Sequence, residues 1–358
     1  MINLRNNKYK NPEIQEYFNI LCDNDFPTFI IPLFPAVESL NDIGMFCATD
    51  YNQLDLFNLK YWYSIFNHSV ATACIVWHLT KCKNQTRIAF LHDIGTPAFN
   101  HCVDFMLKDT INQESSEREL IQIINSNYYL KELLEVYKID INLFRDISKF
   151  PVIENKIPKL CADRLEGVMS TCLVWLKIWD LQDIRKFYKH IIVSTNEFNE
   201  PEISFNDFDA CNFFFEGSLE YAKALQSCED KLSLNYIGDM LNYMIKNDII
   251  RFKDLYTLTE EDIINRIIYG DDENLKKIWA RFTNMDKVYR SDTFVENKYC
   301  ISINSKKRYV DPFLHNRGRI SEISFIAKSQ LEDYLKFKDS EYCYIDTIDF
   351  DSQLLLKK

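Results

Sequence analysis

The chain has 358 residues, of which 47% are apolar, and its formal net charge is −11 at pH 7. This length suffices for a large hydrophobic core and allows either two domains or one large domain. The acidic balance argues against non-specific binding of duplex nucleic acid, which needs a basic face to neutralise phosphates. A local basic pocket for a small phosphorylated ligand remains compatible with this charge.

Glycine and cysteine usage favour a helical protein with reduced thiols. Only 7 glycines are present, so few positions can require positive φ. The 11 cysteines are scattered without a Cys-x-x-Cys pair and are expected mainly to fill the core. The start of the chain lacks a secretory signal, and the apolar stretch 29–37 is interrupted by two prolines. We therefore expect a cytoplasmic protein with no membrane partner.

The predicted elements are mainly helical. Apolar residues at helical spacing predict helices over 65–81, 85–94, from about 99, 115–126, 159–179 and 211–286. An acidic, turn-rich connector is expected at 193–210. Alternating β-branched and aromatic residues at 298–314 and 319–327 predict a small β element near the C-terminus.

These patterns divide the chain into three expected parts. Residues 1–43 form an N-terminal helical or irregular segment, and residues 44–192 form a helical core. Residues 193–358 form a C-terminal extension that is helical at first and then carries the small β element.

The histidines are concentrated in one part of the sequence. Residues 68 to 101 hold four of the six, Asp93 directly follows His92, and Asp163 lies in an otherwise apolar helix. A buried carboxylate there is costly unless it is paired or bound to metal. One divalent ion would satisfy four side chains together, namely His68, His92, Asp93 and Asp163.

The expected cofactor is one divalent metal ion per chain. Two imidazoles and two carboxylates, with space left for waters, suit Mn, Fe, Ni or Mg, and Zn is also compatible. Gly95-Thr96-Pro97 breaks the helix after the pair, which lets His92 and Asp93 face one ion. A single histidine is more often a hydrogen-bonded core residue than a ligand, and His78 is interpreted in that way.

Three segments together resemble the HD-domain metal-dependent phosphohydrolases over about residues 44–180. They are "NHSVATA" (67–73), "LHDIGTPAFNH" (91–101) and "CADRLEG" (161–167). The form after the His-Asp pair is most similar to the deoxynucleoside-triphosphate triphosphohydrolase branch. The resemblance implies a mainly α fold: an HD-domain helical core with a mostly helical C-terminal extension carrying a small β element.

The resemblance also implies roles for individual residues. His68, His92, Asp93 and Asp163 would be the metal ligands. His101, helped by Asp104, would be the acid/base beside the transferred phosphoryl group, which agrees with the chemistry of a His oriented by a carboxylate. The residues expected to contact substrate are Thr96, Gln113, Glu114 and Arg164.

Four positions depart from the triphosphohydrolase pattern. Ile65 replaces an Arg, Thr96 replaces a His, Gln113 ahead of Glu114 replaces another His, and Gly167 replaces a Tyr. Arg and Tyr are the groups that would hold a polyphosphate. Their loss weakens the case for triphosphate hydrolysis and leaves metal binding intact, so we expect a slow or altered activity.

A basic cluster near the C-terminus has two interpretations. It consists of Lys306, Lys307, Arg308, Arg317 and Arg319, interleaved with Tyr309. Such a cluster is usually a solvated face. The alternative is a lid or oligomer contact that brings phosphate-binding charge to the metal.

Two functions follow, from different classes. The first is metal-dependent hydrolysis of a phosphate ester, a nucleotide or another phosphomonoester, with metal-activated water and the His101–Asp104 pair. The second is an HD-fold sensor or regulator that binds a nucleotide with little or no catalysis. The retained pair favours the enzyme, and the missing Arg and Tyr favour the sensor or a smaller substrate. Self-association into a homo-oligomer stays open.

Overall fold

The computed structural model describes residues 11–346, and within them the protein is mainly α, as predicted. The helices of the first half are α1 (Pro12–Leu21), α2 (Ile65–Thr80), α3 (Lys83–Leu91), α4 (Cys102–Met106), α5 (Ser115–Arg118), α6 (Leu120–Ser126), α7 (Tyr128–Tyr137), α8 (Ala162–Ser170) and α9 (Leu181–Tyr188). Those of the second half are α10 (Phe208–Ala224), α11 (Cys228–Lys246), α12 (Glu260–Ile268), α13 (Glu273–Thr283), α14 (Ile320–Ile323) and α15 (Phe325–Lys336).

Seven short strands form two small sheets in this part of the chain. They are β1 (Ile191–Thr195), β2 (Pro201–Phe205), β3 (Tyr289–Ser291), β4 (Tyr299–Ile301), β5 (Phe313–Leu314), β6 (Gly318–Arg319) and β7 (Tyr342–Ile345). One sheet has the order β1-β2-β5-β6 and the other β3-β7-β4. The pair β2–β5 is parallel, whereas the other pairs are antiparallel.

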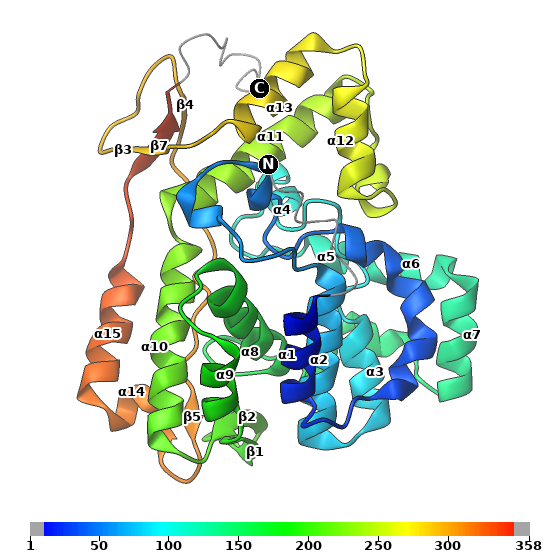
Figure 1. Cartoon of the computed structure of the whole chain (residues 1–358), viewed down its shortest axis with the longest axis vertical. Helices are drawn as coiled ribbons and strands as arrows, with labels where there is room; N and C mark the ends of the chain where they lie inside the picture. The colour runs from blue at the N-terminus through cyan, green and yellow to red at the C-terminus, as the bar shows by residue number, and fades with distance from the viewer. Residues whose placement is uncertain (1–10, 347–358) are drawn as a thin grey trace.

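Helix α2 lies at the centre of the fold. It begins at a capping box formed by Ser64 and Asn67, and every residue from 67 to 76 is buried. A helix buried on all faces must have neighbours all round. Helices α1, α3 and α8 pack against it, as Figure 1 shows. One continuous core runs from Ile14 to Ile345 and joins the three expected parts.

The predicted helices are confirmed with some subdivision. The segment 115–126 contains α5 and α6, and 211–286 contains most of α10 together with α11, α12 and α13. The predicted helix 159–179 is α8 followed by a π-helical turn, Thr171–Trp175. The cysteines fill the core as expected, since ten of the 11 are buried.

Two local predictions are wrong. The expected connector at 193–210 is largely the β1–β2 hairpin, in which Ile191 pairs with Phe205. The stretch 319–327, expected to be β, belongs to β6 only at Arg319 and is otherwise mainly α14 and the start of α15. Ser324 caps α15 by accepting from Ala327 N–H, and this cap together with burial of Ala327, Leu331 and Tyr334 outweighs the local alternation.

The three-part division of the chain stays a prediction. β1 crosses the expected boundary after residue 192, and the core continues across it. Residues 1–10 of the expected N-terminal segment and 347–358 of the expected extension lie outside the described residues. Between 11 and 346, no helix combines the length and apolar character that crossing a membrane requires.

Gly217→Ala is expected to destabilise the protein by about 1–3 kcal/mol through overpacking. A Cβ at Gly217 on α10 would lie 2.0 Å from the ring of Trp179. Gly167→Ala on α8 is the matched control, because its Cβ would meet nothing within 4 Å. Alanine stabilises a helix interior by about 1 kcal/mol relative to glycine. Denaturant unfolding should move the two midpoints in opposite directions, and an unchanged midpoint for Gly217→Ala would contradict the expected clash.

Candidate metal centre

Three helices bring the four predicted ligand side chains together. His68 lies near the start of α2, and Asp163 lies in the first turn of α8. His92 and Asp93 follow directly after the last residue of α3. Because α2 packs against both α3 and α8, side chains from all three helices meet at one place in the core.

The distances within this cluster fit a single divalent ion. The Nε2 atoms of His68 and His92 are 3.4 Å apart, and Asp163 Oδ1 lies 2.9 Å from the first and 3.4 Å from the second. Asp93 Oδ2 is 3.3 and 3.4 Å from the same two nitrogens. Ligand atoms about 2.1 Å from an ion lie about 3.0–3.4 Å apart at octahedral or tetrahedral angles.

The other imidazole nitrogens are already occupied, which fixes the direction of the lone pairs. His92 Nδ1 donates to the carbonyl oxygen of Ala89 at 2.7 Å. His68 Nδ1 donates to the carboxylate of Glu166. With hydrogen on both Nδ1 atoms, each Nε2 is the nitrogen that points to the cluster, and it supplies a lone pair to an ion once its own proton is lost.

Glu166 is a functional residue that the sequence analysis missed. Its side chain is fully buried, and it also accepts hydrogen bonds from Tyr63 Oη at 2.7 Å and Tyr17 Oη at 3.3 Å. A signal was present, because Glu166 follows Asp163 by three residues and shares its helix face. A carboxylate behind a ligating His orients the ring and raises its basicity.

Glu166→Gln should weaken metal binding by about 10- to 100-fold, because it removes the charge behind His68. Competition with a chelator of known affinity would measure the change. Glu202→Gln is a matched control, because Glu202 is also fully buried but pairs with Arg319. It should lower thermal stability and leave the metal affinity unchanged. A metal affinity in Glu166→Gln equal to that of the wild type would show that Glu166 does not support His68 as a metal ligand.

The charges of the four cluster residues and Glu166 stabilise one another. Burial acts to lower the pKa of His68, but the charges of Glu166 and Asp163 and their hydrogen bonds raise that pKa well above its usual range. Burial acts to raise the pKa of Asp163, and hydrogen bonds from both imidazoles lower it well below its usual range. An ion that binds here must therefore displace imidazole protons.

The chain turns sharply after the His92–Asp93 pair. Thr96 is buried and its N–H donates to the Asp93 carbonyl at 2.9 Å. A Cβ at Gly95 would lie 2.2 Å from the backbone oxygen of Ser116. Glycine is therefore the residue that fits where the turn approaches α5, and the predicted break at 95–97 is present.

His101 and Asp104 form the predicted pair. His101 Nδ1 lies 2.8 Å from Asp104 Oδ2, and Asp104 Oδ1 accepts from the Ser115 N–H at 2.9 Å. Burial acts to raise the pKa of Asp104, but the hydrogen bond and charge of His101 lower it overall. The imidazole is half-buried, so its Nε2 is the atom directed away from the carboxylate.

The residues expected to contact substrate have different surroundings. Arg164 donates to Glu154 Oε1 at 2.9 Å and to Asn155 Oδ1 at 2.7 Å, so its guanidinium holds the loop before α8. Burial and the charge of Asp163 raise the pKa of Glu154 to about 7. Glu114 is exposed, and Gln113 lies against Arg308.

The basic cluster divides into separate roles. Arg319 is buried and paired with Glu202, whereas Arg317 is exposed and fits the interpretation as a solvated face. Lys307 Nζ donates to carbonyl oxygens at the end of α15. Arg308 Nη2 lies 3.2 Å from His101 Nε2. A lid or oligomer contact is one interpretation of the basic cluster from the sequence, and this contact of Arg308 is made within one chain.

Two of the positions that depart from the triphosphohydrolase pattern have different surroundings. Ile65 is buried in the core. Gly167 follows Asp163 by one helical turn, and a Cβ there would meet no heavy atom within 4 Å.

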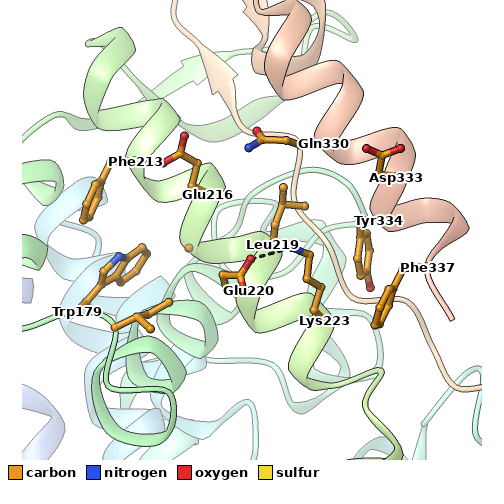
Figure 2. A pocket seen from close by; sticks show the side chains of 12 residues that line it. Trp179, Phe213, Glu216, Leu219, Glu220, Lys223, Gln330, Asp333, Tyr334 and Phe337 are labelled. Carbon is orange, nitrogen blue, oxygen red and sulfur yellow. Dashed lines mark hydrogen bonds and ion pairs between the residues drawn. The ribbon is translucent and has the colours of Figure 1, made fainter. Parts of the chain in front are cut away.

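A separate cleft lies between α10 and α15, away from this cluster. It has a volume of about 510 Å³ and none of the predicted site residues line it. Figure 2 shows Trp179 and Phe213 at one end and Tyr334 and Phe337 at the other, with the Lys223–Glu220 ion pair between them. Its acidic and aromatic lining does not suit a phosphate.

Comparison with known proteins places the fold. No protein-family model matches the chain. It is 21% identical over 261 residues to YdhJ, an uncharacterized protein of Bacillus subtilis (strain 168), covering 72% of this chain and 76% of YdhJ. It is 26% identical over 224 residues to a DNA ligase of Mycoplasmopsis synoviae (strain 53), covering 52% of this chain and 32% of the ligase.

A solved structure shows the same fold. The crystal structure of a phosphohydrolase from Bacteroides thetaiotaomicron VPI-5482 superposes with a TM-score of 0.62 at 12% identity, covering 89% of this chain and 95% of that one. This chain thus has the fold of that phosphohydrolase. The resemblance to the triphosphohydrolase branch rests on the sequence motifs alone.

Proposed function

We propose that this protein is a metal-dependent phosphohydrolase acting on a small phosphorylated substrate, a nucleotide or another phosphomonoester. The observation that carries the proposal is the cluster of two imidazole Nε2 atoms and two carboxylates at the spacing of ion ligands. The fold, which it shares with a phosphohydrolase, supports the same conclusion.

In this proposal the ion is held by four side chains, those of His68, His92, Asp93 and Asp163. The mixed nitrogen and oxygen set suits Mn, Fe, Ni or Mg, and Zn is compatible. Bound there, a divalent ion supplies Lewis acidity toward a phosphoryl oxygen and toward water. Glu166 holds the buried His68 ring in place, and the partly exposed carboxylates of Asp93 and Asp163 leave the cluster open to a substrate.

His101 moves the proton in this proposal. Asp104 fixes hydrogen on Nδ1, so Nε2 is the atom that takes a proton from water or returns one to the leaving oxygen. Thr96, Gln113, Glu114 and Arg164 stay predicted substrate contacts, with Arg164 acting through the loop that it holds.

Product analysis tests the proposal. The metal-loaded protein is incubated with pooled nucleotides and phosphomonoesters, and release of inorganic phosphate, pyrophosphate or triphosphate identifies the reaction. We expect release of one of these products by the wild type and none by Asp93→Ala. Absence of any product with each of the five metals would overturn the proposal.

The sensor is the second candidate, and Ile65 and Gly167, where the resemblance would place an Arg and a Tyr, favour it or a smaller substrate. These positions lack the groups that would hold a triphosphate. Tight nucleotide binding without turnover, measured on the same metal-loaded protein, would support the sensor over the enzyme.

A further inference from the structure

A strap of residues 304–308 crosses from the C-terminal part of the chain to the His101 region. The strap belongs to the segment between β4 and β5, which in Figure 1 runs along α10. Lys306 N–H donates to the Thr110 carbonyl at 2.9 Å, and Thr110 Oγ1 donates to the Asn304 carbonyl at 2.7 Å. Gln226 Nε2 donates to the Lys306 carbonyl at 3.0 Å. The strap is therefore fixed to the loop that leads to Gln113.

Arg308 at the end of the strap reaches the proposed acid/base. Its Nη2 donates to Gln113 Oε1 at 2.6 Å and lies 3.2 Å from His101 Nε2. Among the side chains that the structure describes, none is a hydrogen-bond partner of Nε or Nη1 of Arg308, and no described carboxylate lies within 4.0 Å of the guanidinium. Donors for a further acceptor are thus free.

Two other arginines with little exposed side chain have a counter-ion, since Arg164 pairs with Glu154 and Arg319 pairs with Glu202. Arg87 is also partly buried and has no ion pair with a described carboxylate, but its guanidinium lies over the ring of Tyr137. A half-buried charge without a partner is costly, and an anion from outside the chain would remove that cost.

Asp230, an acid within electrostatic range of Arg308, does not neutralise this charge. Burial raises the pKa of Asp230 to about 8, although Lys231 and Arg308 act to lower it, so its carboxyl is mainly protonated at pH 7. Burial also raises the pKa of Tyr221 to about 12, and the charges of Arg308 and Asp163 both act on that phenol. Tyr221 therefore lies within electrostatic range of both the strap and the metal cluster.

We infer that Arg308 is a phosphate-binding residue of this site and supplies positive charge beside His101. The inference rests on the proposed function for its substrate class. Phosphoryl oxygens bind the free donors of the guanidinium through charge-assisted hydrogen bonds. They also compete with His101 for Nη2, and this competition frees Nε2 of His101 for proton transfer.

Binding of inorganic phosphate to the metal-loaded full chain tests this role directly. Arg308→Gln should weaken phosphate binding, measured by calorimetry, by about 10- to 100-fold, the range for losing a hydrogen bond to a charged group. Arg308→Lys keeps the positive charge but loses the forked guanidinium donors. Its phosphate affinity should lie between that of the wild type and that of Arg308→Gln. Arg317→Gln, the same change at an exposed arginine of the same cluster, should bind phosphate like the wild type.

A second set of measurements separates binding from structure. In Arg308→Gln the metal content should equal that of the wild type, and KM for the substrate should rise in proportion to the phosphate Kd. Unchanged phosphate affinity in Arg308→Gln would overturn the inference, and so would loss of metal, which would place Arg308 in support of the metal centre.

The outcomes also distinguish this inference from the proposed function. A wild type that binds phosphate through Arg308 and hydrolyses nothing would overturn the hydrolase and leave the inference standing. If the wild type hydrolyses phosphate esters, and Arg308→Gln leaves both KM and the phosphate Kd unchanged, the inference is overturned and the hydrolase stands.

Discussion

Asp163→Asn is expected to release the metal ion and reduce phosphate-ester turnover to background. Asp163 Oδ1 is the carboxylate oxygen nearest His68 Nε2, and it joins α8 to the ligands of α2 and α3. Asparagine keeps the size of the side chain and loses its charge. Elemental analysis should give about one ion per wild-type chain and almost none in the variant.

The expected content of one ion per chain takes account of a second group of possible metal ligands. Glu154 and Cys161 also approach an oxygen of Asp163, but this group shares Asp163 with the first cluster. The second group adds no histidine and has no ligand beyond Glu154 and Cys161 apart from the shared Asp163, so we expect one ion per chain in the described residues.

The same substitution should remove stabilisation by metal. An ion at 100 times its Kd stabilises the native state by about 2.7 kcal/mol, and the variant should show none of this gain when melting is followed with and without metal. Asp209→Asn, an exposed change on α10, is the control and should melt and bind metal like the wild type. Full metal content in Asp163→Asn would show that the ion is held by other residues.

Local patterns allowed much of the fold and the ligand set to be predicted. The helix at 65–81 has apolar residues at helical spacing, and tertiary packing reinforces the same pattern. His92 and Asp93 stand next to a Gly-x-Pro break, so their special position was visible in the sequence. The four ligands could be grouped because a carboxylate in an otherwise apolar helix, that of Asp163, was expected to need pairing, hydrogen bonds or a metal ion.

Contacts between distant positions could not be predicted. Arg308 and His101 are 207 residues apart, and only the strap's hydrogen bonds to the 109–113 loop bring them together. The hairpin at 191–205 depends on cross-strand partners, and β2 also pairs with β5 more than 100 residues later. Residues 319–327 alternate like a strand, yet the Ser324 cap and the burial of Ala327 and Leu331 one turn apart select a helix.

His101→Ala is expected to keep the metal and lower turnover per folded molecule by about 10²- to 10⁴-fold, the usual contribution of a positioned acid/base. The imidazole contacts Asp104 and Arg308, and it does not belong to the cluster of metal-ligand atoms. Its removal should therefore leave the ligand spacing intact. Metal content, melting and turnover are to be measured on one preparation, below the melting temperature of the variant.

Some loss of stability should accompany this change. Asp104 is fully buried, and without His101 it retains the Ser115 N–H bond alone on that side, a deficit of about 1–3 kcal/mol. His190→Ala is the matched control. His190 directly precedes β1, contacts Asn206 and has no proposed role. Its turnover should equal that of the wild type.

The three readouts assign His101 to one of three roles. Retained metal with lost turnover supports proton transfer by Nε2, and the loss should be larger in kcat than in KM, since Arg308 rather than His101 binds the phosphate. Lost stability with preserved turnover per folded molecule would make the His101–Asp104 pair a structural contact. Loss of the metal would make His101 a ligand, and the proton would then have to move through another group beside the cluster.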